Sequence, residues 1–398
     1  MIRKCCSTAF AVILTLCLIL QSLVIGVNAL DAPQSAEYIL ETIGEGELGL
    51  DCRSALLMEA STGVVLYEQN ADEMLPPASV TKVMTLLLVM EAIEAGGVKL
   101  DDIVTTSANA ASMGGSQIFL EEGEQMNVED MLKSVVIASA NDAALALAEH
   151  ICGSETAFVA RMNERARELN MQGTVFENTN GLDDTTQKHL TCARDIAIMS
   201  RELIKHDKIL EYSSIWMDSV RDGSFGLTNT NRLVRYYPGC TGLKTGSTAK
   251  AGFCISATAQ RNGMSLICVI MGAPSRDVRN AAAVSLLDWG FAEYGVFRAE
   301  GGCGEPLSVM GGERDECATE YAQFSCVLPS SEIARVTQTL EQNEVVKAPI
   351  KKGDEVGRAT YKCGDTIVGS VPIVAAEDIE RITFTQLLLR LLAIFVLE

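Results

Sequence analysis

Hydrophobic and polar positions follow two different periods along the first half of the chain. Residues 54–60 and 64–68 are apolar, partly β-branched runs around Ser61-Thr62-Gly63, a pattern that predicts a β-hairpin with a glycine-containing turn. Further along, apolar residues recur every three or four positions, which is the period of a helix with one buried face. The helices predicted in this way span residues 83–93, 128–138, 143–152, 154–170 and 191–204.

A second pair of strands follows these helices. Residues 253–259 and 266–271 flank Arg261-Asn262-Gly263, which predicts another hairpin, and 276–294 predicts a long helix. Strands at both ends of a helical region are typical of an antiparallel sheet with helices packed on its faces. The predicted fold class is therefore α+β.

After residue 295 the pattern of the sequence changes from helical periodicity to short strand-like runs. Short strand-like runs separated by glycines occur at 318–328, 344–349 and 367–375. They predict a small β-rich domain that follows the helix-and-sheet region.

The last apolar run, 384–397, is too short to cross a bilayer. Gln386 and Arg390 are four residues apart and fall on one side of a helix, which favours an amphipathic helix lying in a membrane interface. The alternative is a buried terminal helix of the β-rich domain.

The beginning of the chain has the pattern of an export signal. Arg3 and Lys4 precede an apolar stretch at 9–25, and Val27-Asn28-Ala29 has the small residues of a cleavage site. An uncleaved N-terminal anchor is the alternative, because the stretch is close to the length that spans a bilayer. In either case we expect the rest of the chain to lie outside the cytoplasm.

Composition excludes several kinds of partner and site. The formal net charge is -20, so the surface repels nucleic acid. With only three histidines in 398 residues, a histidine-based triad or metal site is disfavoured. Ten of the thirteen cysteines follow the predicted signal, and four of them cluster near the C-terminus and are candidates for two disulfide bridges of undetermined pairing. These four are Cys303, Cys317, Cys326 and Cys363.

A serine and a lysine stand three residues apart at the start of the first predicted helix. Residues three apart share a helix face, so Ser79 and Lys82 are expected side by side. A partly desolvated amine beside a hydroxyl can take its proton, which makes the serine a nucleophile without any histidine. Taken alone, this spacing is common and has a structural alternative, a helix-capping serine next to a solvated lysine.

Two further motifs give this pair possible partners. Ser139-x-Asn141 lies between two predicted buried helices, and Lys244-Thr245-Gly246 precedes the strand 253–259 as an expected edge of the sheet. The chemistry assigns a role to each residue. Ser79 attacks a carbonyl, Lys82 accepts its proton, and Ser139 relays a proton to the leaving amine. Asn141 holds Lys82 and the substrate amide by hydrogen bonds, Lys244 attracts an anionic substrate end, and Thr245 binds a carboxylate. Gly246 allows the substrate backbone to approach, and the backbone amides of Ser79 and Ser247 form an oxyanion hole.

The three motifs in this order resemble those of the penicillin-recognising serine enzymes. Flanking residues resemble the low-molecular-mass penicillin-binding proteins that are D-alanyl-D-alanine carboxypeptidases, over about residues 54–291. The matching segments are 77–85, 113–120, 139–143, 176–182 and 242–247.

The resemblance implies a penicillin-binding protein/β-lactamase-like transpeptidase fold and removal of the terminal D-alanine from peptidoglycan stem peptides through an acyl-enzyme on Ser79. It also implies β-lactams as slow pseudo-substrates, and a C-terminal segment that holds the enzyme on the outer face of the cytoplasmic membrane. No metal or organic cofactor is implied. The resulting division of the chain is a signal peptide (1–29), a penicillin-binding catalytic domain (30–295), a β-rich domain (296–380) and a membrane-anchoring tail (381–398).

Two positions depart from the pattern of the family. Some relatives carry histidine where this chain has Ser247, and some carry an arginine where Asn229-Thr230-Asn231 stands. Arg232 or Arg276 are candidates to replace that arginine, although an ordinary surface or ion-pairing role is favoured for each. The group that binds the substrate carboxylate, apart from Thr245, is thus left open.

Two other functions are disfavoured by the sequence. A class A β-lactamase needs a glutamate that activates the deacylating water, and Ala166 stands where that glutamate is expected. A catalytically silent, wall-binding scaffold is disfavoured because every catalytic position is filled.

Overall fold

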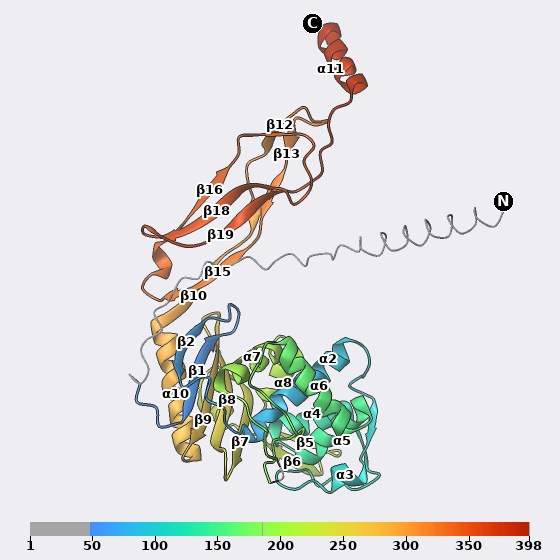
Figure 1. The fold of residues 1–398 in the computed structure, drawn as a ribbon, viewed down its shortest axis with the longest axis vertical. Helices are drawn as coiled ribbons and strands as arrows, with labels where there is room; N and C mark the ends of the chain where they lie inside the picture. Colours follow the sequence, from blue (N-terminus) through green and yellow to red (C-terminus); the bar gives the residue numbers. More distant parts are fainter. Residues whose placement is uncertain (1–47, 185, 398) are drawn as a thin grey trace, which may run out of the picture.

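The computed structural model describes residues 48–184 and 186–397. The predicted signal peptide lies outside the described residues. The described chain forms a helix-and-sheet domain, a β-rich domain and a terminal helix, which follow one another along the long axis of the molecule (Figure 1).

The first domain is organised around a five-stranded antiparallel sheet. The two predicted hairpins meet in it: β1 pairs with β2 on one side and with β9 on the other, and β8 pairs with β9. The strand that carries the Lys-Thr-Gly motif completes the sheet as its edge, as predicted. In sheet order the strands are β2 (Val65–Gln69), β1 (Ser54–Glu59), β9 (Met264–Ala273), β8 (Gly252–Arg261) and β7 (Cys240–Thr248).

Helices cover both faces of this sheet, which confirms the predicted α+β class. The long helix α10 (Arg276–Glu293) packs on one face, where Leu286 and Leu287 join a buried apolar cluster with the strands. The other face meets a block of helices around α2 (Lys82–Glu94) and α7 (Ala193–Leu203), with a second and larger core between them. The remaining helices of the block are α4 (Val128–Ile137), α5 (Asn141–Cys152), α6 (Glu155–Glu168) and α8 (Asp207–Ser213).

Helix starts agree with local capping chemistry. Asn127, Ser154 and Ser275 each accept a hydrogen bond from a backbone N–H of the first turn of α4, α6 and α10. The sequence pattern did not reveal α8, or the short elements around the helical block. These elements are β3 (Ile103–Thr105), α3 (Ala108–Ala111), β4 (Gln125–Asn127), β5 (Met217–Val220), β6 (Phe225–Thr228) and α9 (Leu233–Tyr236).

The β-rich domain begins directly where α10 ends. Strand β10 (Tyr294–Ala299) pairs with β15 (Phe324–Pro329) and leads into two further sheets, of five and three strands, with Phe324 stacked on Tyr361 in the core. The other strands are β11 (Gly302–Cys303), β12 (Leu307–Met310), β13 (Glu316–Cys317), β14 (Thr319–Tyr321), β16 (Val336–Gln342), β17 (Val345–Lys347), β18 (Glu355–Cys363) and β19 (Thr366–Ala375).

The candidate disulfides are not formed. All ten cysteines among the described residues are free thiols. The four clustered cysteines lie on four different strands, β11, β13, β15 and β18, which belong to three separate sheets. None of the four is disulfide-bonded, although Cys326 and Cys363 lie close enough to interact electrostatically.

The apolar C-terminal run forms helix α11 (Phe384–Leu397) at the far end of the molecule (Figure 1). Its large apolar side chains up to residue 392 are not packed into the β-rich domain: Phe384 is 80% exposed and Leu389 is 61% exposed. The interpretation of this run as a buried terminal helix is thus wrong. None of the described helices has the length and hydropathy needed to cross a membrane.

Candidate active site

Ser79 lies in a 3₁₀ turn, Ala78–Thr81, that leads into α2. Pro77 precedes the turn and its carbonyl accepts a hydrogen bond from the Val80 N–H. Ala78 has a positive φ of 48°, which is unusual for a residue other than glycine and fixes the direction in which Ser79 leaves the loop. The predicted neighbours meet, because the Nζ atom of Lys82 lies 2.9 Å from Ser79 Oγ.

Lys82 is fully buried and forms no ion pair with a carboxylate among the described residues. Its Nζ atom also contacts Asn141 Oδ1 at 2.5 Å and the backbone oxygen of Asn180 at 3.0 Å. Burial, together with the nearby charge of Lys244, lowers the pKa of Lys82 well below its ordinary value, while Asp142 acts in the opposite direction. An amine in these surroundings loses its proton readily and can act as a base.

The junction between α4 and α5 supplies the second motif. Ser139 has a positive φ of 62° and lines a cavity, while Asn141 begins α5 and accepts from Lys82. The Asn141 side-chain amide donates to the Gly114 carbonyl at 2.6 Å. The Asn141 side chain therefore fixes the loop that carries Ser116. Asn141 does not line the cavity, whereas the sequence predicts a contact between Asn141 and the substrate amide.

The third motif lies on the edge strand β7. Lys244 is buried, donates to the Thr245 carbonyl oxygen at 2.9 Å, and has a pKa lowered to about 7 by burial and by the charge of Arg279. Thr245 donates from its hydroxyl to the Thr230 hydroxyl at 2.8 Å. Gly246 passes so close to the 3₁₀ turn Ala78–Thr81 that an added Cβ atom would lie 2.7 Å from the Ser79 nitrogen.

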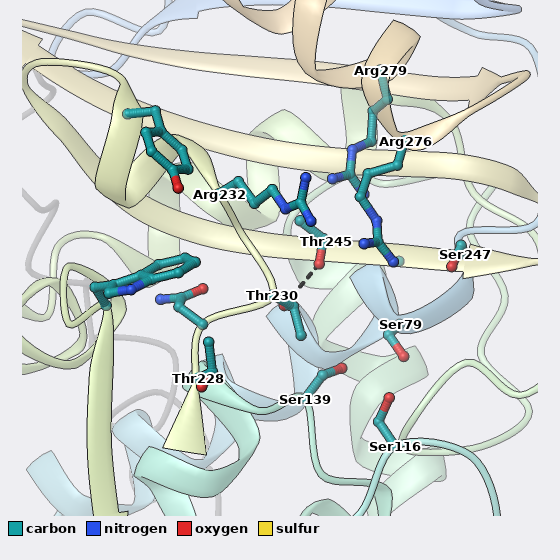
Figure 2. Close-up of a pocket in the computed structure, with 14 residues that line it drawn as sticks. Ser79, Ser116, Ser139, Thr228, Thr230, Arg232, Thr245, Ser247, Arg276 and Arg279 are labelled. Carbon is teal, nitrogen blue, oxygen red and sulfur yellow. Dashed lines mark hydrogen bonds between the residues drawn. The ribbon is translucent and has the colours of Figure 1, made fainter. Parts of the chain in front are cut away.

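These elements surround a cavity of about 580 Å³ (Figure 2). Five of the eight predicted site residues line it, and the other three are buried behind its wall. Those that line it are Ser79, Ser139, Thr245, Gly246 and Ser247; those behind it are Lys82, Asn141 and Lys244.

Three arginines line the same cavity. Figure 2 shows Arg232, Arg276 and Arg279 on the side where Thr245 lies. Arg279 is buried and donates to the Cys254 carbonyl oxygen and to the Asn280 side chain. Arg232 and Arg276 are exposed, as expected for ordinary surface arginines. However, both line the cavity, and neither forms an ion pair within residues 48–184 and 186–397.

The cavity is basic although the protein is acidic. Among the described residues, no Asp or Glu lines it, whereas the whole chain carries a net charge of -20. Such a pocket attracts an anionic ligand while the rest of the surface repels one. A serine hydroxyl beside a buried amine of lowered pKa, together with a cluster of guanidiniums, is suited to acyl transfer from a substrate with a free carboxylate.

Sequence reasoning missed several residues of the cavity wall. Arg279 stands three residues after Arg276 on one face of α10, a spacing that could have revealed the pair. The remaining members come from loops or from the ends of the short elements β6 and α9, none of which has a clear periodicity. They are Ser116, Trp216, Thr228, Asn229, Thr230 and Tyr236.

Comparison with known proteins identifies the family. The profile of the D-alanyl-D-alanine carboxypeptidase family matches residues 42–275, which is more than half of the chain. The chain belongs to this family. It is therefore a hydrolase of the serine carboxypeptidase type, and the predicted function is confirmed at this level. The C-terminal domain of penicillin-binding protein 5 matches residues 308–381, in the β-rich domain.

Relatives and solved structures agree with this assignment. The D-alanyl-D-alanine carboxypeptidase DacF of Bacillus subtilis is 39% identical over 94% of this chain and 97% of its own length. The crystal structure of penicillin-binding protein 5 from Haemophilus influenzae has a TM-score of 0.74 at 28% identity, covering 83% of this chain and 98% of that one. Penicillin-binding protein D2 of Listeria monocytogenes in its ampicillin-bound form has a TM-score of 0.54 at 31% identity, covering 61% and 98%. The predicted penicillin-binding protein fold is confirmed.

Proposed function

We propose that Ser79 is the nucleophile of this carboxypeptidase and that it forms an acyl-enzyme with the penultimate D-alanine of peptidoglycan stem pentapeptides. The observation that carries the proposal is the buried amine of Lys82, which lies 2.9 Å from Ser79 Oγ and forms no ion pair with a carboxylate among the described residues. A neutral Lys82 donates to the oxygens of Asn141 and Asn180 and accepts the proton of the serine hydroxyl.

The proton then travels toward the leaving amine. As the Ser79 oxygen attacks the carbonyl carbon, its proton moves to Lys82, and the C–N bond to the terminal D-alanine breaks as Ser139 passes a proton to the departing nitrogen. The negative charge on the carbonyl oxygen is stabilised by the backbone N–H groups of Ser79 and Ser247. Water hydrolyses the ester and frees the serine. Removal of the terminal D-alanine eliminates an acyl donor, which limits cross-linking of the cell wall.

The substrate carboxylate binds where Thr245, Arg232 and Arg276 meet. Both guanidiniums are free to pair with an anion, and Arg279 keeps the local potential positive from behind. The charge of Lys244 acts from the buried side of β7. Arg232 and Arg276 are thus the groups that we propose to bind the substrate carboxylate together with Thr245.

β-Lactams acylate the same serine, and the resulting acyl-enzyme is hydrolysed slowly. Ala166, at the position where a class A β-lactamase places its water-activating glutamate, is buried in α6, and no described carboxylate lines the cavity. Fast hydrolysis of the acyl-enzyme from a β-lactam is thus disfavoured.

The test combines labelling and turnover. Wild type is expected to bind a fluorescent penicillin covalently and to release D-alanine from diacyl-Lys-D-Ala-D-Ala, and Ser79→Ala is expected to do neither. Ser330→Ala, in the β-rich domain, is the matched serine control. Labelling that persists in Ser79→Ala refutes the assignment of the nucleophile, whereas labelling of wild type without D-alanine release refutes the carboxypeptidase role.

We also propose that the enzyme is exported and that α11 holds it on the outer face of the cytoplasmic membrane. The exposed apolar side chains of α11 support this, together with Arg390, which pairs with Asp315 and with the Glu313 backbone oxygen and so fixes the helix on the β-rich domain. The change from helix to strand at Glu293 and Tyr294 supports the proposed limit between the catalytic and β-rich domains.

Binding of the full chain to phosphatidylglycerol-containing vesicles tests the membrane proposal. Leu389→Glu is expected to lower sedimentation with vesicles because it places a charge on the apolar surface of α11. The control Leu340→Glu makes the same change at an exposed leucine of β16 and is expected to bind like wild type. Equal binding by Leu389→Glu contradicts the proposal.

A further inference from the structure

We propose that Asp142 is a positioning residue of this reaction: its buried carboxylate holds the loop that carries Ser116 against the cavity and balances the charge of the buried Lys82. Asp142 follows Asn141 at the start of α5. It is fully buried, does not line the cavity, and forms no ion pair with any of the described residues. A buried carboxylate without an ion pair is stable only where hydrogen bonds replace its water. The inference rests on the proposed function, which gives Ser79 and Lys82 their roles.

The hydrogen bonds of Asp142 come mainly from one loop. Its carboxylate accepts from the Ile118 N–H at 3.1 Å and from the Leu120 N–H at 3.0 Å, and also from the N–H of the next residue, Ala143, at 2.9 Å. Phe119, between the two loop donors, has a positive φ of 57° and is 66% exposed. Because the Phe119 side chain is not packed in the core, this strained turn depends on its backbone contacts, above all on the two N–H groups that meet one carboxylate.

The loop is held from two sides. On the side of α5, the Asn141 N–H donates to the Ser116 carbonyl oxygen at 2.7 Å. On the opposite side, the Arg221 guanidinium donates to the Ile118 carbonyl oxygen at 2.8 Å and to the Phe119 carbonyl oxygen at 3.2 Å. The N–H groups of the loop thus bind Asp142, whereas its carbonyl oxygens bind the Asn141 N–H and Arg221.

The position of this loop matters because Ser116 lines the cavity beside the nucleophile. In Figure 2 the side chains of Ser79, Ser116 and Ser139 point toward one another. A shift of the loop therefore changes the space in which the acyl group is held, and small displacements in such a site are costly to the rate. Asp142 itself acts through the loop and touches no substrate.

Asp142 also acts on Lys82 through its charge. Burial lowers the pKa of Lys82 most, the charge of Lys244 on β7 lowers it further, and the charge of Asp142 on α5 raises it. His189, on the far side of Thr81, is neutral because burial lowers its pKa to about 4. The direct contacts of the Lys82 amine are neutral groups of Ser79, Asn141 and Asn180. Asp142 therefore supplies the negative charge that opposes burial and Lys244.

Neutral replacements of Asp142 separate the two effects. Asp142→Asn removes the charge, so the pKa of Lys82 falls further and more of the amine is neutral at low pH. It also weakens the loop at every pH, since its amide keeps only one acceptor oxygen. We expect kcat/KM for D-alanine release to be about tenfold lower than in wild type at pH 9. The ratio of variant to wild type should rise about threefold to tenfold as the pH is lowered to 5. Asp142→Ser, which is neutral and shorter, should show the same rise with a larger loss at pH 9.

Arg221→Met is the matched control. It loosens the same loop from the opposite side, and the Arg221 charge does not contribute to the pKa of Lys82. We expect a lower kcat/KM whose ratio to wild type is the same at pH 5 and pH 9. A ratio that does not change with pH in either Asp142 variant refutes the charge-balancing role, and wild-type kcat/KM in Arg221→Met refutes the role of the loop. Thermal unfolding verifies that each variant is folded. If wild type itself releases no D-alanine, the proposed function fails.

Discussion

The Nε2 atom of His189 lies 2.8 Å from the Oγ1 atom of Thr81, although 108 residues separate them in the sequence. The Thr81 hydroxyl donates to the Ala78 carbonyl oxygen, so it accepts from the imidazole. On the other side of the ring, Nδ1 accepts from the Glu177 N–H at 3.0 Å. His189 therefore carries its proton on Nε2, and burial lowers its pKa to about 4, which keeps the ring neutral.

The contact between His189 and Thr81 stabilises the 3₁₀ turn Ala78–Thr81 from outside the cavity. Ala78, the residue before Ser79, has a positive φ, and its carbonyl oxygen accepts the hydroxyl that His189 fixes. The loop beside it holds Asn180, whose oxygen contacts Lys82. His189 thereby couples the position of the serine to the position of the amine.

Replacing His189 tests this positioning role. We expect His189→Ala to lower kcat/KM about tenfold to hundredfold, because small displacements of a nucleophile are costly. His189→Gln keeps an N–H donor toward Thr81, and His189→Asn keeps only an acceptor toward Glu177. The rate of penicillin acylation should therefore be restored more by glutamine than by asparagine. Equal rates in the two variants, with equal thermal stability, contradict the role.

The sequence predicted those parts of the site that depend on local geometry. Ser79 and Lys82 meet because they are three residues apart at a helix start, and Thr245 faces the cavity because β7 is the edge of the sheet. The guanidiniums were harder to place. Arg232 and Arg276 reach the cavity only because α9 packs on β7 and α10 packs on β8 and β9, which no local pattern encodes.

The fold shows the same division. Hairpins with glycine turns and amphipathic helices were recognised, since their periodicity reflects one buried face. Strand β16 was missed, because nearly all of its side chains are exposed and no alternation exists in Val336–Gln342. Trp216 lies between α8 and β5, in a segment with neither period. Its place in the cavity follows from hydrogen bonds to distant backbone, such as that from Asn229.

The charge of Lys244 predicts a pH dependence. Its pKa is lowered to about 7, so its positive charge is present below this pH and is lost as the pH rises through it. An arginine stays charged over the same range. We expect Lys244→Arg to be less active than wild type at low pH, because the guanidinium is larger.

The measurement is the ratio of kcat/KM between Lys244→Arg and wild type at a series of pH values. Deprotonation of Lys82 affects both proteins and largely cancels. The ratio should rise several-fold as the pH increases from about 6 to about 9, since only wild type loses its charge. A ratio that does not change with pH would show that the Lys244 charge has no part in binding the carboxylate.

Burial of Lys244 also predicts a conflict between stability and activity. In the unfolded chain this lysine has an ordinary pKa near 10.5, whereas in the folded state it is about 7. The unfolded state binds more protons between these values, so wild-type stability falls as the pH drops from about 10.5 to about 7 and stays reduced below that. Lys244→Met removes this cost. It should raise the free energy of unfolding by roughly 1–3 kcal/mol at pH 6 and lower D-alanine release. The measurement is urea unfolding at pH 6, and a lower free energy of unfolding for Lys244→Met than for wild type would contradict the prediction.

Gly246 allows the edge strand to approach the nucleophile. A Cβ atom there would lie 2.7 Å from the Ser79 nitrogen, 2.9 Å from the Val80 nitrogen and 3.0 Å from the Pro77 oxygen, all of them backbone atoms that cannot rotate away. Gly246→Ala must therefore push β7 from the 3₁₀ turn and widen the oxyanion site. We expect a loss in kcat/KM of about a hundredfold, measured as D-alanine release, with a similar loss in penicillin acylation.

The matched control for this change is Gly226→Ala. Gly226 is also a strand residue, in β6, but an added Cβ atom there meets no atom within 4 Å. Its activity should equal that of wild type, because the methyl group enters open space. If Gly246→Ala is as active as Gly226→Ala, the strand and the turn are not held in contact during the reaction. If both variants lose activity, the effect comes from replacing a strand glycine and not from the crowding of Ser79.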